Sequence, residues 1–197
     1  SARLIEADAQ WRDKSIYKDM VLALGEYCRR HVAANQDIAF VTELFDETTK
    51  LDIVAASKKE YPSIQLSLSS KVDNATVPFK ELVERWHAVR AYSKKPVARV
   101  ELEKAIEMSL RTPSVCNRQP ARVRIFTDQQ LISKALKVQG GFGGYDTPPA
   151  LLLVTADLRA FMGANEHNEG YVDGGLFGMS LLYSLETCGL AACPLNT

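Results

Sequence analysis

The sequence lacks several features that would assign it directly to a class of protein. Its 197 residues carry 24 basic and 24 acidic side chains, so the formal net charge is zero. A neutral chain has no overall attraction for nucleic acid or for an anionic membrane surface. No apolar run approaches the roughly 20 residues that a membrane-spanning helix needs. We therefore expect neither nucleic acid nor a membrane among its partners.

Cysteine and histidine are also scarce. The four cysteines form no CxxC pair, and the three histidines lack the spacing typical of metal ligands. The sequence therefore predicts no metal site and no disulfide framework, with reduced and mostly buried thiols. The first residues carry charge and lack the apolar segment of a signal peptide. Together these absences predict a cytoplasmic protein.

Neither end of the chain is expected to be that of a complete protein. The first residue is serine rather than methionine, so the natural start is expected upstream or is removed by processing. The chain stops at Pro194-Leu195-Asn196-Thr197, soon after a predicted helix, with no final helix or strand. We therefore expect the last elements of the core to be missing.

The residues that are present divide into two parts. In the first, apolar residues recur every three or four positions over 16–32 and again over 38–54, which predicts a helical hairpin. Residues 35–37, Asn-Gln-Asp, are suited to capping the second helix. Over 61–77, proline, serine, aspartate and asparagine interrupt a short alternating stretch, as in a linker. Residues 1–77 are therefore predicted to be a helical extension with a linker.

The second part, residues 78–197, mixes helices and strands, and this mixture predicts an α+β fold. Apolar spacing predicts a helix in each of the ranges 79–86, 102–110, 131–136 and 171–189. The last of these is apolar on nearly all sides, so it must be buried. Strands are predicted by alternation over 122–126, by a continuous apolar run over 150–155, and more briefly over 190–193.

The most informative pattern is a polar loop enclosed by Pro113 and Pro120. Proline fixes φ and so stiffens the loop. Ser114, Asn117 and Gln119 offer hydrogen-bonding groups suited to a flat heteroaromatic ligand. The residues alone leave two interpretations open, a structural loop and a ligand-binding loop.

This loop resembles the Pro-Ser-x-x-Asn-x-Gln-Pro motif of the nitroreductase family. Residues 81–97 are similar to the opening helix of that family and its Arg-Arg-Ser-Val-Arg-x-Phe motif. Residues 139–144, 173–175 and 189–196 follow in an order similar to nitroreductase-like proteins associated with polysaccharide biosynthesis. The resemblance covers residues 78–197. It implies an α+β fold in which a mainly antiparallel sheet is flanked by helices.

The resemblance implies an FMN-dependent oxidoreductase that works as a homodimer. By a ping-pong mechanism, hydride would pass from NAD(P)H through the flavin to an electron-poor small molecule, such as a nitro compound or a quinone. No catalytic side chain is then required, because the chemistry belongs to the cofactor. The residues that would inherit cofactor binding are Arg90, Pro113, Ser114, Asn117, Gln119, Pro194, Leu195 and Asn196.

Two positions depart from the phosphate site of the family. Trp86 and Ala88 stand where the family has arginine and serine, which leaves Arg90 as the matching charged donor. This departure motivates a second hypothesis, a dimeric interaction module of the same fold that has lost FMN. Two others stay open, a flavin-modifying or dehalogenating enzyme and a small-molecule binder without turnover.

Two further features receive structural interpretations. The glycines of the long predicted helix, at positions 174, 175 and 178, favour close helix packing, including packing across a dimer interface. Cys116, inside the polar loop, is interpreted as a small packing residue rather than a redox thiol.

Overall fold

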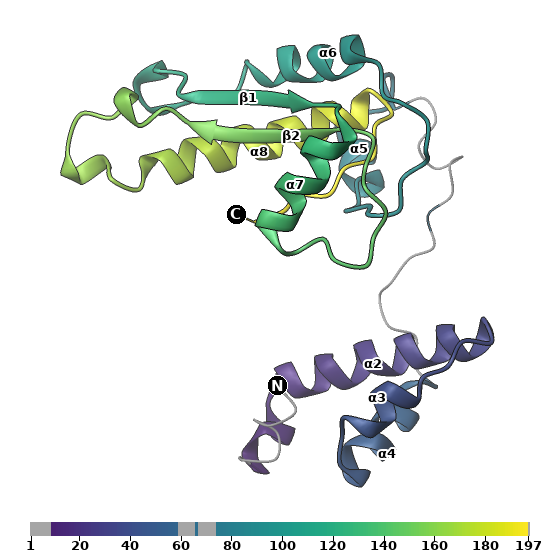
Figure 1. Cartoon of the computed structure of the whole chain (residues 1–197). Coiled ribbons are helices and arrows are strands. Elements are labelled where there is room, and N and C mark those ends of the chain that lie inside the picture. Colours follow the sequence, from purple (N-terminus) through teal and green to yellow (C-terminus); the bar gives the residue numbers. More distant parts are fainter. Residues whose placement is uncertain (1–8, 59–65, 67–73, 197) are drawn as a thin grey trace. The chain divides into compact units, whose positions relative to one another are not determined.

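The structure, a computed structural model, describes residues 9–58, 66 and 74–196. The chain divides into two compact units, Ser1–Gln65 and Leu66–Thr197 (Figure 1). Most of the predicted linker over 61–77 lies outside the described residues, and where the N-terminal extension ends stays a prediction. Among the described helices, none combines the length and the apolar character needed to cross a membrane.

The first unit contains the predicted helical hairpin, with one difference. A short 3-10 turn, η1 (Ala9–Asp13), precedes α2 (Ser15–Ala33), which is the first predicted helix. The second predicted helix is divided into α3 (Ala39–Glu43) and α4 (Glu47–Ala56). The division follows from Asp46, whose carboxylate accepts a hydrogen bond from the backbone N–H of Thr49 at 2.7 Å. An aspartate in this position starts a new helix.

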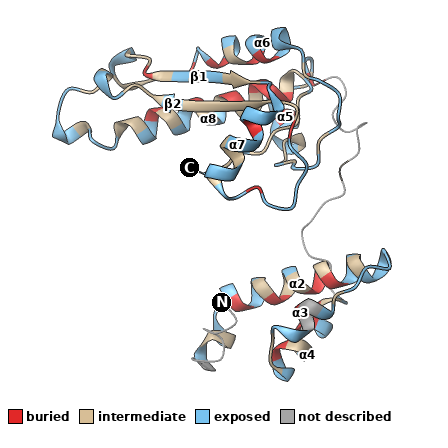
Figure 2. Ribbon diagram, in the orientation of Figure 1, coloured by how far each residue is buried: buried red, intermediate tan, exposed pale blue. Residues whose placement is uncertain are grey.

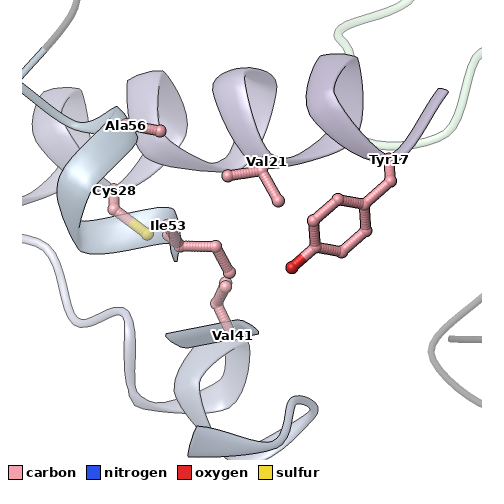
Figure 3. Packing of buried hydrophobic residues seen from close by; sticks show 6 residues of the cluster. All are labelled: Tyr17, Val21, Cys28, Val41, Ile53 and Ala56. Atoms are coloured by element: carbon pink, nitrogen blue, oxygen red, sulfur yellow. The ribbon is translucent and has the colours of Figure 1, made fainter. Parts of the chain in front are cut away.

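The core of the first unit lies between α2, α3 and α4 (Figure 3). Its buried face on α2 differs by one position from the predicted one, since Tyr17 is buried while Ile16 is 59% exposed. The Tyr17 hydroxyl donates to Asp52 at 2.6 Å and so joins α2 to α4. Gly25 permits this close approach, because a Cβ there would lie 2.7 Å from the backbone nitrogen of Ser57. The cluster consists of Tyr17, Val21, Cys28, Val41, Ile53 and Ala56.

The second unit has the predicted mixture of helices and strands. Its helices are α5 (Phe79–Arg85), α6 (Arg99–Ser109), α7 (Gln129–Gln139) and α8 (Glu169–Thr187), and its strands are β1 (Ala121–Phe126) and β2 (Leu151–Ala156). Three 3-10 turns join them, namely η3 (Val115–Asn117), η4 (Leu158–Ala160) and η5 (Ala164–Glu166). Each of these helices and strands corresponds to one that apolar spacing predicts, so the α+β prediction is confirmed.

The two strands pair in antiparallel fashion, with Ala121 opposite Ala156 and Phe126 opposite Leu151. α6 and α8 pack with them around one apolar core, and α8 runs along the strands (Figure 1). The strands are mostly half-buried, so β2 is less enclosed in the single chain than its apolar sequence predicts (Figure 2). A two-stranded sheet explains this, because each strand has an uncovered edge. The buried core residues are Leu102, Ala105, Phe177, Leu181 and Leu185.

The strand predicted over residues 190–193 is reduced to one parallel bridge, between Ala88 and Ala192. The backbone N–H of Val89 donates to the carbonyl of Ala192 at 3.0 Å. Pro194 follows, and proline has no N–H with which to continue a ladder. This bridge nevertheless places the segment that leads to Arg90 beside the segment that leads to Pro194.

Candidate functional site

The loop between α6 and β1 has an unusual backbone. Cys116, Asn117 and Gln119 have φ angles of 47°, 54° and 51°, and elsewhere in the described chain only Asn35 among the non-glycine residues has a positive φ. Left-handed backbone costs a residue with a side chain roughly 1 kcal/mol or more. Such conformations persist where the surroundings hold them, and they concentrate at binding sites. The loop is therefore a candidate site on its geometry as well as on its sequence.

The predicted side chains of this loop bond to one another. The Ser114 hydroxyl accepts from the backbone N–H of Gln119 at 2.9 Å. The Gln119 amide donates to the carbonyl of Thr112 at 3.1 Å and to the side-chain oxygen of Asn117 at 2.8 Å. The Ser114 hydroxyl hydrogen and the Asn117 amide nitrogen bond to no other described residue, so both stay available to a ligand. Pro113 and Asn117 are exposed, and Ser114 and Gln119 are half-buried.

Two contacts tie the loop to the beginning of α8 and the segment before it. The carboxylate of Asp173, which is 3% exposed, accepts from the backbone N–H of Val115 at 3.1 Å. The Arg118 guanidinium donates to the two carboxylate oxygens of Glu166 at 2.7 and 3.1 Å. The hydrogen bonds from Arg118, together with one from the backbone N–H of Met162, lower the pKa of Glu166. Neither Arg118, Glu166 nor Asp173 was among the predicted site residues, because no spacing in the sequence links positions so far apart.

The remaining predicted residues form a second group. Arg90 is exposed, and it lies two residues after the bridge that joins Ala88 to Ala192. The carbonyl of Asn196 accepts from the Gln139 side chain at 2.5 Å, which holds the segment of Pro194 and Leu195 near the end of α7. Tyr92 lies near Cys193, where the two segments of this group meet. Its burial, and after that the proximity of Cys193, raise the pKa of Tyr92 to about 12.

Trp86 and its neighbours determine which charged groups could bind a phosphate at the positions that depart from the family motif. Trp86 directly follows α5 as its C-cap, and its indole N–H is buried with no hydrogen-bond partner among the described residues. The neighbouring Arg85 does not replace the missing cation, because it donates to Asn74 at 3.0 Å and to Glu81 at 3.2 Å. Arg90 is exposed, and its guanidinium lies within electrostatic reach of Tyr92. Of the positions that the resemblance assigns to a phosphate, Arg90 is therefore the one that supplies a cation.

The two groups are anchored at opposite ends of α8. Asp173 bonds to the loop near the start of this helix, and the bridge at Ala192 follows its end at Thr187. The helix rises about 21 Å from Asp173 to Thr187, at roughly 1.5 Å per residue. The structure thus brings together the predicted residues within each group, and the points at which the two groups are anchored lie at opposite ends of α8.

Comparison with known proteins supports the assignment of the fold. The family model described as Nitroreductase family matches residues 83–142. The chain is similar to the Bacillus subtilis protein ydfN, described as a nitroreductase, with 18% identity and a TM-score of 0.54 over 60% of this chain and 74% of that chain. The fold is nitroreductase-like.

Two further structures share this nitroreductase-like fold. A nitroreductase family protein of Clostridium difficile 630 is 22% identical, with a TM-score of 0.51 over 61% of this chain and 70% of that one. NfrA1 of B. megaterium is 16% identical, with a TM-score of 0.53 over 58% and 52%. No curated protein matches the sequence. At these identities the similarity establishes the fold, and function has to be argued from the site.

The long helix of the nitroreductase-like fold leaves part of its apolar surface uncovered. Val172, Leu176 and Met179 recur at helical spacing and are 52%, 46% and 37% exposed. A Cβ added to any of the glycines at positions 174, 175 and 178 would meet no atom within 4 Å. We call the surface formed by Val172, Gly175, Leu176 and Met179 the α8 face. The prediction that the helix is buried on all sides is therefore not met within a single chain.

The sequence predicts no metal site. In the ranges that the structure describes, no cluster of three His, Cys, Asp or Glu side chains is placed to hold a metal ion.

Proposed function

We propose that the protein is an oxidoreductase that binds FMN and moves hydride from NAD(P)H to an electron-poor small molecule, such as a nitro compound or a quinone. The observation that carries the proposal is the loop between α6 and β1. It holds three left-handed residues in a fixed arrangement and leaves donors of Ser114 and Asn117 available. Fixed polar groups of this kind suit a flat ring with nitrogens and carbonyls.

The cofactor would supply the hydride chemistry, and the chain would supply position and polarity. Pro113, Ser114, Asn117 and Gln119 would contact the ring and the ribityl chain. The backbone N–H groups of Leu195 and Asn196, after Pro194, would donate to the edge of the ring. Arg90 would bind the phosphate, since a guanidinium makes strong charge-assisted bonds to phosphate oxygens.

We further propose that the complete site is formed by a homodimer. Within one chain the loop and the Arg90 segment are anchored at opposite ends of α8. The α8 face offers a second copy an apolar surface on which Gly175 allows close approach. A second copy packed on this face would allow the loop of one chain to meet the Arg90 segment of the other.

A second candidate function is a dimeric interaction module that has lost FMN. The observation that favours it is Trp86, whose indole replaces a cation and whose N–H has no partner among the described residues. With Arg90 as the one matching cation, the affinity for a phosphate is reduced relative to a site with several charged donors. The two candidates differ in one measurable property, the retention of FMN.

The test is a visible absorbance spectrum of the purified protein, taken before and after FMN is added and the excess is removed. We expect a bound flavin, and then oxidation of NADH or NADPH that depends on both the protein and a quinone. Free FMN at the same concentration is the control for background turnover. A protein that takes up no FMN contradicts the proposal and supports the interaction module. Bound FMN without turnover supports a binder.

Three finer points stay predictions. They are the identity of the physiological acceptor, the association with polysaccharide biosynthesis, and a cytoplasmic location. A screen of acceptors on the flavin-loaded protein, once FMN retention is established, addresses the first of these.

A further inference from the structure

We propose that Arg118 is a positioning residue for the flavin ring, acting through its ion pair with Glu166. The inference rests on the proposed function, because it concerns the loop that would contact the ring. Arg118 itself lies between Asn117 and Gln119 and need not touch the cofactor. Its role is to fix the backbone on which those two residues stand.

The ion pair has the geometry of a fixed structural link. Arg118 donates to both oxygens of Glu166 and, at 2.9 Å, to the carbonyl of Ala160. Both side chains are largely enclosed, with 17% and 18% of their surfaces exposed. A bidentate pair in this setting has defined geometry and is screened less by solvent than an exposed pair.

The partner of Arg118 is itself held in place. Glu166 accepts a further hydrogen bond from the backbone N–H of Met162 at 2.7 Å. The guanidinium thus reaches two points of the segment between β2 and α8, one through Ala160 and one through Glu166. A lysine would present a single ammonium in place of the planar fork, so it is not expected to satisfy these acceptors together.

The position of Arg118 in the loop explains how its ion pair with Glu166 restrains the loop backbone. Arg118 has right-handed backbone, with φ −77°, while Asn117 before it and Gln119 after it are left-handed. The backbone therefore changes from left-handed to right-handed at Arg118 and back to left-handed at Gln119. A side chain fixed at the middle of the three restrains both changes. Its bonds to Ala160 and Glu166 reach outside the loop, whereas the bonds of Ser114 and Gln119 lie within it.

The experiment compares Arg118→Met, Arg118→Lys, Glu166→Gln and the double variant Arg118→Met with Glu166→Gln. Arg159→Met is the matched control, because Arg159 lies in the same segment as Ala160 but is 90% exposed and pairs locally with Asp157. The affinities for FMN and for riboflavin are measured by titration. Hydrogen exchange of the amides of Val115 and Gln119 is measured in the flavin-free protein, so that loop order is read without a cofactor.

We expect Arg118→Met to weaken the binding of FMN and riboflavin by the same factor, about tenfold, and to speed exchange of the two loop amides. The flavin affinity of Arg118→Lys should fall between that of the wild type and that of Arg118→Met. The double variant should bind each flavin with an affinity within about twofold of that of the weaker-binding single variant, because both substitutions break the same ion pair. Glu166→Gln keeps the shape of the side chain, so it tests the same ion pair if Arg118→Met does not fold.

Three results would overturn the inference. In the first, Arg118→Met binds both flavins as well as Arg159→Met does. In the second, FMN binding alone is weakened, which would place Arg118 at the phosphate. In the third, the effects of the two single substitutions add in full. A wild-type protein that takes up neither flavin overturns the proposed function itself, and that result is seen before any variant is made.

Discussion

The buried carboxylate of Asp173 accepts a hydrogen bond from the backbone N–H of Val115, at 3.1 Å to one oxygen and 3.3 Å to the other. This bond joins the beginning of α8 to the loop directly after Ser114. The same helix carries the α8 face on its outer surface. The position of the loop is therefore set by the helix that we propose to form the dimer contact.

Replacing Asp173 with alanine should destabilise the fold. The substitution leaves the Val115 N–H without its charged acceptor, and hydrogen bonds to charged groups contribute about 1.5–3 kcal/mol. We expect the free energy of unfolding in urea to fall by about 2 kcal/mol. Asp146→Ala, at an exposed loop position, is the control and should change little. Equal stability of the two variants would show that the bond contributes nothing measurable.

Replacing Arg90 with methionine should weaken binding of the FMN phosphate without changing binding of the flavin ring. Loss of a charge-assisted phosphate contact should weaken FMN binding by about tenfold or more while riboflavin, which lacks the phosphate, binds as before. Both dissociation constants are measured by titration. Arg99→Met, on the exposed surface of α6 where Arg99 pairs with Glu103, serves as the control. Equal weakening of both ligands would argue against Arg90 as the phosphate ligand.

Replacing Leu176 with glutamate should abolish the proposed dimer. A charge on the α8 face would have to be buried against a second copy without a partner, which is costly. Sedimentation velocity should show a dimer for the wild type and a monomer for Leu176→Glu. Val138→Glu places the same charge on α7, at a valine that is 89% exposed, and should leave the dimer intact. A monomeric wild type would refute the proposed assembly.

Tyr92 should make stability depend on alkaline pH. Burial, followed by the neighbouring Cys193, raises the pKa of Tyr92 from 10.0 to about 12. The folded state holds the phenol proton more tightly than the unfolded chain does. This contribution to stability is therefore complete below about pH 10 and is lost as the pH rises toward about 12. In urea unfolding, the free energy of unfolding of the wild type should fall relative to that of Tyr92→Phe as the pH rises above about 10, because only the wild type carries the titrating phenol. Parallel curves would contradict the assignment.

Much of the fold could be predicted because its elements have strong local patterns. The alternation over 122–126 and the apolar run over 150–155 identify β1 and β2, and their antiparallel pairing fits the short sheet. The division of the second N-terminal helix at Asp46 was missed, since apolar spacing continues across the cap. The predicted face of α2 began at Ile16, whereas the buried face begins at Tyr17, whose hydroxyl reaches Asp52 on α4, a contact that apolar spacing does not indicate.

The candidate site was predictable only in part. The loop between Pro113 and Pro120 is contiguous, so its residues necessarily lie together, and its motif identifies them. The link from Arg118 to Glu166 spans 48 positions, and no local pattern indicates it. The placement of Arg90 and the loop at opposite ends of α8 depends on how the helix packs, which the order of motifs along the chain does not reveal.

The arrangement along α8 has a consequence for mixed assemblies. In the proposed dimer each chain gives its loop to one pocket and its Arg90 segment to the other. Subunits carrying Arg90→Met and subunits carrying Arg118→Met, when paired, then yield one pocket with both substitutions and one with neither. Two defective proteins would together restore an intact centre, with half the flavin stoichiometry of the wild type.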